Sequence, residues 1–332
     1  ACALPIWCCE ACGNTTRKGD GGGFIFDCYT QNSVLEYCYA HDNGGYGFAL
    51  VHTGRPLWHS NTLRYSISHN DGRIGKGDGG IVVYAPGGTD TLSNGRVYHN
   101  TVIMDAPDTG DVKGIYLMTG MRSFSFRNNL VRGGYGVPAV QCDFNAAPVD
   151  VVFQGNAWRS EGGAPLARWN GKDCDDIAQW RLAAGQEILD GKPVGLAGST
   201  ALAAGISPVT IGIERIDEME NLLECYRPVS GSAVIDNGLE LHDRFGIARA
   251  SRDICGTETD KNTTPDIGAC EYVAPTMAGI PLCSHNCRVS DSPERSLFIL
   301  KNRHGAGFSL NGRRLPVQNT GRFPAGGAYI GK

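Results

Sequence analysis

Hydrophobic residues recur along this chain in short groups, separated by polar turns that contain glycine, asparagine or aspartate. One series begins with a glycine followed by an apolar stretch; it occupies residues 23–26, 47–50, 80–83, 114–117 and, in a weaker form, 138–140. A second series, of alternating apolar and polar residues, occupies 34–37, 62–65, 95–98, 123–126 and 151–153. Alternation with a period of two is typical of β-strands. The pattern predicts pairs of short strands that repeat with a variable spacing.

Strands this short cannot bury an apolar face alone, so we expect the repeats to stack and to enclose one continuous core. In the first series the inward residues are predicted to be Phe24/Phe26, Phe48/Leu50, Ile81/Val83 and Ile115/Leu117. In the second series they are predicted to be Leu35/Tyr37, Leu63/Tyr65, Val97 and Phe124/Phe126.

Asparagine recurs at the turn that follows the second strand. Asn100, Asn129 and Asn156 occupy comparable places, and Cys38 and Ser66 take the same place in earlier repeats. Stacked asparagine amides can hydrogen-bond from one repeat to the next, and asparagine tolerates left-handed backbone. These residues therefore predict a structural ladder.

The repeats resemble the right-handed parallel β-helix family, the pectate-lyase-like fold, over roughly residues 19–161. Three later strings, YRPVSGSAVIDNG at 226–238, RDICG at 252–256 and PDIGACEY at 265–272, resemble the segment that closes many secreted bacterial β-helix proteins. The resemblance implies an all-β chain, a right-handed parallel β-helix or solenoid, with an end covered by the closing segment. A propeller is the weaker alternative, because its blades need four longer strands each.

The domain organisation follows from this assignment. Residues 1–18 are expected to be an unassigned or truncated N-terminal edge, and 19–272 the β-helix with its closing segment. Residues 273–296 read as a linker that contains proline, serine and cysteine. Residues 297–332 predict a small, truncated β tail, which resembles the sorting domain that Bacteroidota use for type IX secretion.

Two helices are expected outside the repeats. In the segment 173–185, Asp173 can cap a helix, Ile177 and Trp180 share one face, and Gly185 can end it. We expect this short helix to lie over the side or the open end of the stack. A second helix is possible over 214–225.

Composition narrows the class of protein. The chain has 332 residues and a formal net charge of −4, so it lacks the excess of basic residues that nucleic-acid binding requires. No apolar run approaches the roughly 18 residues that span a bilayer, so no membrane insertion is expected. The 13 cysteines, an odd number, favour an oxidising compartment without revealing any pairing. We expect a monomer that is extracellular or on the cell surface, and the resemblance of the tail to a sorting domain implies export by a Gram-negative bacterium.

Charged residues gather in the first three repeats, so a polymer-binding site is predicted there. The candidate catalytic residues are Asp42, His69, Asp71, Arg73 and Lys76. In a lyase, Ca²⁺ held by Asp71 and Asp78 would neutralise a uronate while Lys76 or Arg73 takes the proton. In a hydrolase, Asp42 and Asp71 would flank the glycosidic bond. The substrate-binding candidates are Asp27, Glu36, His41, His52, Arg64, Tyr84 and Tyr116.

Two functions remain open from the sequence. The first is a polysaccharide lyase or glycoside hydrolase that acts on an extended glycan, with Ca²⁺ or with no cofactor. The motifs of the β-helix polygalacturonases are missing, which counts against a pectin hydrolase. The second is a non-catalytic protein that binds glycan or builds a surface structure. Under that alternative, Asn-Asp-Gly at 70–72 is an ordinary turn whose side chains bond to their own backbone.

Overall fold

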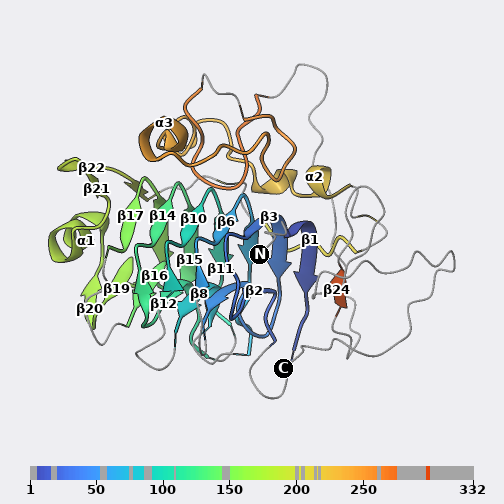
Figure 1. The fold of residues 1–332 in the computed structure, drawn as a ribbon, viewed down its shortest axis with the longest axis horizontal. Coiled ribbons are helices and arrows are strands. Elements are labelled where there is room, and N and C mark those ends of the chain that lie inside the picture. Colours follow the sequence, from blue (N-terminus) through green and yellow to red (C-terminus); the bar gives the residue numbers. More distant parts are fainter. Residues whose placement is uncertain are drawn as a thin grey trace, which may run out of the picture.

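The computed structural model describes residues 6–15, 21–52, 58–74, 78–85, 92–107, 110–143, 150–198, 206–212, 218–259, 263–274 and 297–299, with the single residues 202 and 215. Within these residues most of the regular structure is β-strand, and nearly all strand pairs are parallel (Figure 1). The chain is therefore an all-β protein built on large parallel sheets, as the alternating pattern predicts.

Three parallel sheets carry the fold in the described part of the chain. Sheet A contains β1 (Ile6–Cys12), β3 (Val34–His41), β6 (Thr62–Arg64), β7 (Ile67–His69), β10 (Arg96–Tyr98), β11 (Thr101–Met104), β14 (Ser125–Arg127), β15 (Leu130–Tyr135), β17 (Val152–Gln154), β18 (Ala157–Glu161), β23 (Leu196–Ala197) and β24 (Leu297–Ile299). Sheet B contains β2 (Phe24–Phe26), β4 (Phe48–Val51), β8 (Gly79–Tyr84), β12 (Lys113–Leu117), β16 (Val140–Cys142), β19 (Ala167–Trp169) and β20 (Lys172–Cys174). Sheet C contains β5 (Trp58–His59), β9 (Leu92–Ser93) and β13 (Met121–Arg122), and a separate hairpin pairs β21 (Ile188–Leu189) with β22 (Lys192–Pro193).

Sheet B contains the glycine-led strands in one ladder. Phe24 pairs with Phe48, Phe48 with Ile81, and Ile81 with Ile115. The predicted stacking of these four segments is thus confirmed. Their inward side chains form one buried cluster with residues of sheets A and C, among them Leu63 and Trp58.

Strand β1 is a correction to the sequence-based expectation, which assigned no structural role to residues 1–18. It pairs in parallel with β3, with Ile6 opposite Leu35 and Cys12 opposite His41. Cys9 and Ala11 face the core, although cysteine-rich sequence at this point hides the apolar alternation. Strand β24 pairs antiparallel with β1, and the rest of 297–332 lies outside the described residues.

In the described repeats, sheet A bends at one residue with left-handed backbone. The next residue in the chain belongs to a ladder of side chains that continues from repeat to repeat. The left-handed positions include Tyr37, Tyr65 and His99. The asparagine ladder follows them: Asn129 Oδ1 accepts from Asn100 Nδ2 at 2.9 Å, and Asn156 Oδ1 accepts from Asn129 Nδ2 at 2.9 Å. The predicted ladder is confirmed, and the buried carboxylate of Glu187 extends it by accepting from Asn156 Nδ2 at 2.7 Å.

The left-handed bend also turns two predicted core residues outward. Tyr37 and Tyr65 belong to a second buried cluster on the outer face of sheet A, not to the interior. Leu35 and Leu63, two residues earlier, do face the interior. The alternation breaks because one left-handed residue re-aims the strand.

Helix α1 (Ile177–Ala184) closes one end of the core (Figure 1). Its buried Trp180 packs against the rings of Phe153 and Trp158, both at 5.3 Å between centroids. Gly185 ends the helix in a left-handed conformation, as expected. The N-cap is Asp176 rather than Asp173, because Asp173 lies in β20 and pairs with Arg168. The possible second helix is shorter, consisting of α2 (Met219–Leu222) and the 3₁₀ turn η2 (Glu224–Tyr226).

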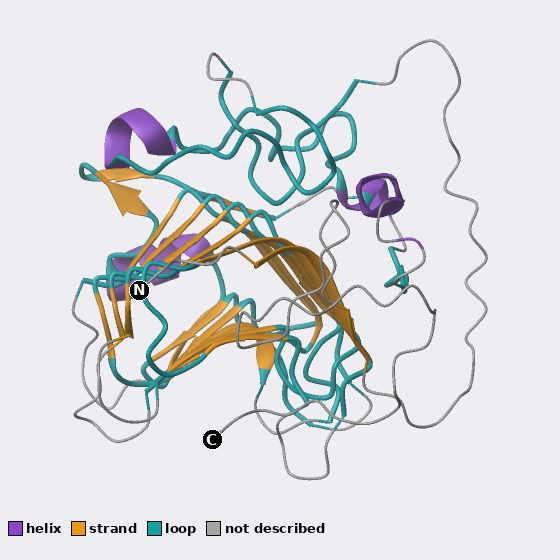
Figure 2. Cartoon of the chain, turned by 45° about the vertical axis from the view of Figure 1, so that its right-hand side comes forward, coloured by secondary structure: helices purple, strands orange, loops and turns teal. Residues whose placement is uncertain are grey.

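The C-terminal segment, by which we mean the described residues between 206 and 272, lies along the outer face of sheet A and includes helix α3 (Leu241–Phe245) (Figures 1 and 2). Its Leu223, Tyr226 and Ile254 pack on outward residues of the sheet, including Tyr39 and Ile67. The sequence suggested that this segment covers an open sheet edge. It covers a face instead, because the outward tyrosines make that face apolar.

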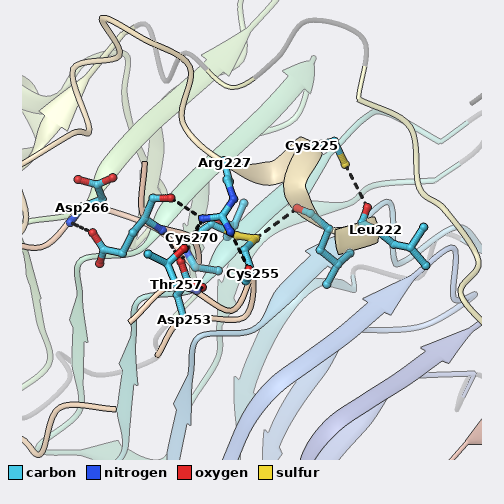
Figure 3. Close-up of a disulfide and its surroundings, with 12 residues drawn as sticks. Leu222, Cys225, Arg227, Asp253, Cys255, Thr257, Asp266 and Cys270 are labelled. Atoms are coloured by element: carbon cyan, nitrogen blue, oxygen red, sulfur yellow. Dashed lines mark hydrogen bonds and ion pairs between the residues drawn. A yellow bond between two sulfur atoms is a disulfide. The ribbon is translucent and has the colours of Figure 1, made fainter. Parts of the chain in front are cut away.

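A disulfide and one arginine hold this segment together (Figure 3). Cys255 bonds to Cys270. Arg227 donates to the backbone oxygens of Cys255 and Glu271 at 2.6 and 2.8 Å, and its guanidinium lies 3.6 Å from the fully buried carboxylate of Asp253. The three C-terminal strings recognised in the sequence are thus joined through one cation.

We expect Arg227→Lys to lower the free energy of unfolding by about 1–2 kcal/mol, because an ammonium keeps the charge beside Asp253 but loses the planar fork of donors. Chemical denaturation measures this. Arg215→Lys is the matched control, because Arg215 pairs with Glu218 at the surface, where such pairs contribute little. Equal losses in the two variants would contradict the role given to Arg227.

Candidate functional site

The structure removes Asp71 from any surface site. Its side chain is fully buried, with Oδ1 accepting from the backbone and side-chain nitrogens of Asn43 and Oδ2 accepting from Ser68 Oγ at 2.5 Å. It stands at the end of a second ladder that begins at Asn14 and passes through Asn43. Asp71 has no exposed surface, and Oδ1 already accepts two hydrogen bonds and Oδ2 a third, so the residue cannot touch a glycan or join Asp78 in a Ca²⁺ site. Its partners are Asn43 of the preceding repeat and the Ser68 side chain rather than its own backbone, so Asp71 is a ladder residue.

The predicted residues on the outer face of sheet A lie beneath the C-terminal segment. His69 is fully buried, and its Nδ1 lies 2.6 Å from Tyr226 Oη. Burial lowers the pKa of His69 to about 4, so its imidazole is neutral at physiological pH. Arg64 pairs with Glu36 at 2.6 Å and donates to the backbone oxygen of Ala248 at 3.0 Å. Arg64 and His69 thus bind the C-terminal segment, which covers this face of sheet A. A polymer therefore cannot reach them.

The remaining candidates of the early repeats have local partners. Asp42 is half-exposed and lies 2.9 Å from His41 Nδ1, and Arg73 donates to the backbone oxygen of Asp105 at 2.7 Å. Asp27 accepts from the backbone of Cys28 at 2.7 Å, as a turn residue does. His52 is buried. Lys76 lies outside the described residues.

Tyr84 and Tyr116, in contrast, are partly exposed on the outer face of sheet B. Tyr116 lies in β12 opposite Gln141 of β16, and Arg168 of β19 follows Gln141 in the same register. One column of polar and aromatic side chains therefore crosses neighbouring strands, which are about 4.8 Å apart.

A group of side chains surrounds Tyr116, which we name the sheet B cluster: Asp111, Lys113, Tyr116, Gln141 and Asp143. Tyr116 Oη donates to Asp143 Oδ2 at 3.0 Å, and Gln141 Nε2 donates to the same oxygen at 2.7 Å. Lys113 Nζ donates to Asp111 Oδ2 at 2.8 Å and lies 4.7 Å from the centre of the Tyr116 ring. The cluster joins a cation, two carboxylates and a hydroxyl on neighbouring strands of one sheet.

Burial and nearby acids hold the hydroxyl of Tyr116 in its protonated form. Desolvation, followed by the hydrogen bond and charge of Asp143, raises its pKa to about 12. A protonated phenol can donate to a ligand oxygen or to a leaving group. The ammonium of Lys113 is almost completely buried, where water screens its charge less than at the surface.

The sequence-based prediction included Tyr116 and missed its partners. Lys113 and Asp143 lie 30 residues apart in the chain, and neither belongs to the charge-rich early repeats. Aligning the glycine-led strands would have provided a signal, because Lys113 immediately precedes Gly114 and Asp143 follows the weakest strand of that series.

A cavity of about 290 Å³ lies between the outer face of sheet A and the C-terminal segment. Tyr65, Tyr98 and His99 form part of its wall, opposite acidic residues that include Asp266 and Glu271. Burial, with the adjacent charge of Asp266, raises the pKa of Glu271 to about 8. The backbone groups next to Glu271 are hydrogen-bonded within the C-terminal segment. The cavity is therefore formed by the way this segment packs on the sheet.

Every helix in the described part of the chain is too short or too polar to cross a bilayer. Compared with protein-family models and with curated proteins, the chain has no match.

Proposed function

We propose that this chain is a right-handed parallel β-helix protein of the pectate-lyase-like type that acts on an extended polysaccharide along the outer face of sheet B. The parallel register of sheets A, B and C supports the β-helix, because within the described residues each repeat from β4 to β18 adds one strand to sheet B and two to sheet A, and three of these repeats also add one to sheet C. The proposal depends on the sheet B cluster, in which Lys113, Tyr116 and Asp143 converge on an outward face.

An extended glycan suits this face because the column of Tyr116, Gln141 and Arg168 presents one group on each strand. Tyrosine rings pack on the apolar faces of sugars, and amides and guanidinium groups bond to hydroxyls and carboxylates. A polymer lying across the strands would meet a new contact about every 4.8 Å.

Cleavage at the cluster can follow two routes. In elimination, a carboxylate of the cluster, Asp111 or Asp143, would take the proton beside a uronate carboxylate, the bond to the leaving oxygen would break, and a carbon–carbon double bond would form. Lys113 would then offset the carboxylate charge while Tyr116 protonates the leaving oxygen. In hydrolysis, Asp111 and Asp143 would supply the two carboxyl groups. The cluster places a cation, Lys113, beside a phenol, Tyr116, and this combination favours elimination over hydrolysis.

The experiment incubates the full chain with polygalacturonate, with alginate and with an uncharged β-glucan. New ultraviolet absorbance with new reducing ends indicates a lyase, whereas reducing ends without absorbance indicate a hydrolase. We expect Tyr116→Phe to lower kcat/KM by about 100-fold, since it removes only the hydroxyl.

Tyr135→Phe is the matched control, because Tyr135 is 77% exposed on sheet A, away from the cluster. If Tyr116→Phe and Tyr135→Phe are equally active, the sheet B cluster takes no part in the reaction. No product on any polymer, with retention on an insoluble glycan that Tyr116→Ala weakens, would support the non-catalytic binding alternative. Neither product nor retention would contradict the proposal as a whole.

We further propose that the protein acts outside the cell as a monomer, exported by a Gram-negative bacterium. The disulfide between Cys255 and Cys270 supports an oxidising compartment. The sorting tail remains part of this proposal, since residues 300–332 lie outside the described residues.

A further inference from the structure

Three potential metal ligands meet where the first two strands of sheet A lie side by side. Glu10 and Cys12 are alternate residues of β1, so they share one face of the strand. His41 of β3 lies directly opposite Cys12 in the parallel register. One donor atom from each of the three side chains lies within 4.8 Å of the others.

The imidazole of His41 is held with one nitrogen aimed at this group. Its Nδ1 lies 2.9 Å from Asp42 Oδ2, while its Nε2 lies 3.1 Å from Glu10 Oε1. Metal-binding histidines almost always donate their second ring N–H to a carboxylate or carbonyl, which fixes the tautomer and the ring orientation. The ring of Tyr39 stacks on His41 at 4.5 Å and limits its rotation.

The carboxylate of Glu10 is held as firmly. It is 1% exposed, and the backbone nitrogens of Ile211 and Gly212 donate to its two oxygens at 2.6 and 2.8 Å. These donors come from the C-terminal segment, so the group lies at the junction of β1, β3 and the cover. A carboxylate, a ring nitrogen and a thiol that face one another away from water can share one positive charge, which a metal ion or a proton would supply.

We propose that Glu10, Cys12 and His41 bind a transition-metal ion of the Zn²⁺ class, with Asp42 as the positioning residue for His41. A thiolate, an imidazole and a carboxylate together suit Zn²⁺, whereas Ca²⁺ requires six or more oxygen ligands. The ion ties the first strand to its neighbour and to the cover. This site is separate from the sheet B cluster and does not depend on the function proposed for it.

The sequence alone does not pick out this set of ligands. Cys8, Cys9 and Cys12 lie close together in the chain. Cys9 faces the core, however, so it cannot share a site with Cys12, which lies on the other face of the strand. The partner of Cys12 comes 29 residues later, at the place where the next repeat returns to the same face.

The test uses the full chain, stripped of metal and kept free of oxygen, and titrates it with Co²⁺ alone as a spectroscopic substitute for Zn²⁺. We expect one equivalent to produce a thiolate-to-cobalt charge-transfer band. Cys12→Ser should abolish that band, and Cys8→Ser, a matched substitution on the same strand, should retain it. Asp42→Asn should keep the band but weaken binding by about 10–100-fold.

Zn²⁺ competition and thermal unfolding complete the test. Excess Zn²⁺ should displace Co²⁺ and raise the Tm of the wild type but not that of Cys12→Ser. If Cys12→Ser does not fold, His41→Gln must lose the tight binding instead. Absence of the band in the wild type, its survival in Cys12→Ser or its loss in Cys8→Ser would each overturn the proposal, and a proton would then be the positive charge between Glu10 and His41.

Discussion

Asn129→Ala should lower the free energy of unfolding by about 3–5 kcal/mol, because it removes the middle of a buried ladder. The Asn129 amide accepts from both the backbone and side-chain nitrogens of Asn100 and donates to Val97 O at 3.0 Å. Truncation to alanine leaves these buried groups without partners. Each such group costs roughly 1–3 kcal/mol.

Urea denaturation followed by circular dichroism measures this loss. Asn237→Ala is the matched control, because Asn237 is exposed and bonds only to the nearby backbone of Ile235. We expect the control to change stability by less than about 0.5 kcal/mol. A loss below about 1 kcal/mol in Asn129→Ala would contradict the ladder as a main source of stability.

Between pH 5 and pH 8 the wild type should lose stability relative to Asp71→Asn, by on the order of 2–3 kcal/mol. Burial raises the pKa of Asp71 from 3.8 to about 7, although hydrogen bonds from Ser68 and Asn43 oppose the shift. Between those two values the folded protein holds a proton that the unfolded chain releases. The stabilisation is therefore complete below about pH 4 and is lost as the pH rises through about 7.

The amide introduced by Asp71→Asn cannot titrate and keeps an acceptor for Asn43, so the stability of the variant should follow the rest of the protein. The difference between the two proteins isolates Asp71 from other groups. Burial also raises the pKa of Glu187 to about 7, whereas it lowers that of His99 to about 4, and these two have opposite effects on the pH dependence. Denaturation midpoints across the pH range provide the measurement.

Asp243→Asn serves as the control at an exposed carboxylate, where water screens the charge and the substitution should change stability little. A catalytic role for Asp71 predicts the reverse pattern, namely lost turnover with unchanged stability at every pH. Such a result would return Asp71 to the candidate catalytic residues.

The strands of sheet B were predictable because a local pattern, glycine followed by alternating apolar residues, carries both the strand and its inward face. Phe24, Phe48, Ile81 and Ile115 were placed in one ladder on that basis, and the structure pairs them. The asparagine ladder was predictable because a stacking amide recurs at comparable places in the repeats, although the left-handed residue lies one position earlier, as at His99.

The candidate site was not predictable in the same way. Charge in the early repeats looked like a surface feature, yet Arg64 and His69 lie under a segment that comes more than 130 residues later. The partners of Tyr116 come from other strands, and their proximity depends on register. One stretch of sequence reveals neither which distant segment covers a sheet face nor how the strands of a sheet are aligned.

The sequence by itself therefore determined the short strands, the faces they bury and the residues that ladder at the bends, because these depend on neighbours within a few positions. Only the tertiary structure decided which polar side chains stay outside. That outcome depends on which distant segment covers each face. The apolar tyrosines of sheet A attract the C-terminal segment, whereas Tyr116 and Arg168 of sheet B stay partly exposed.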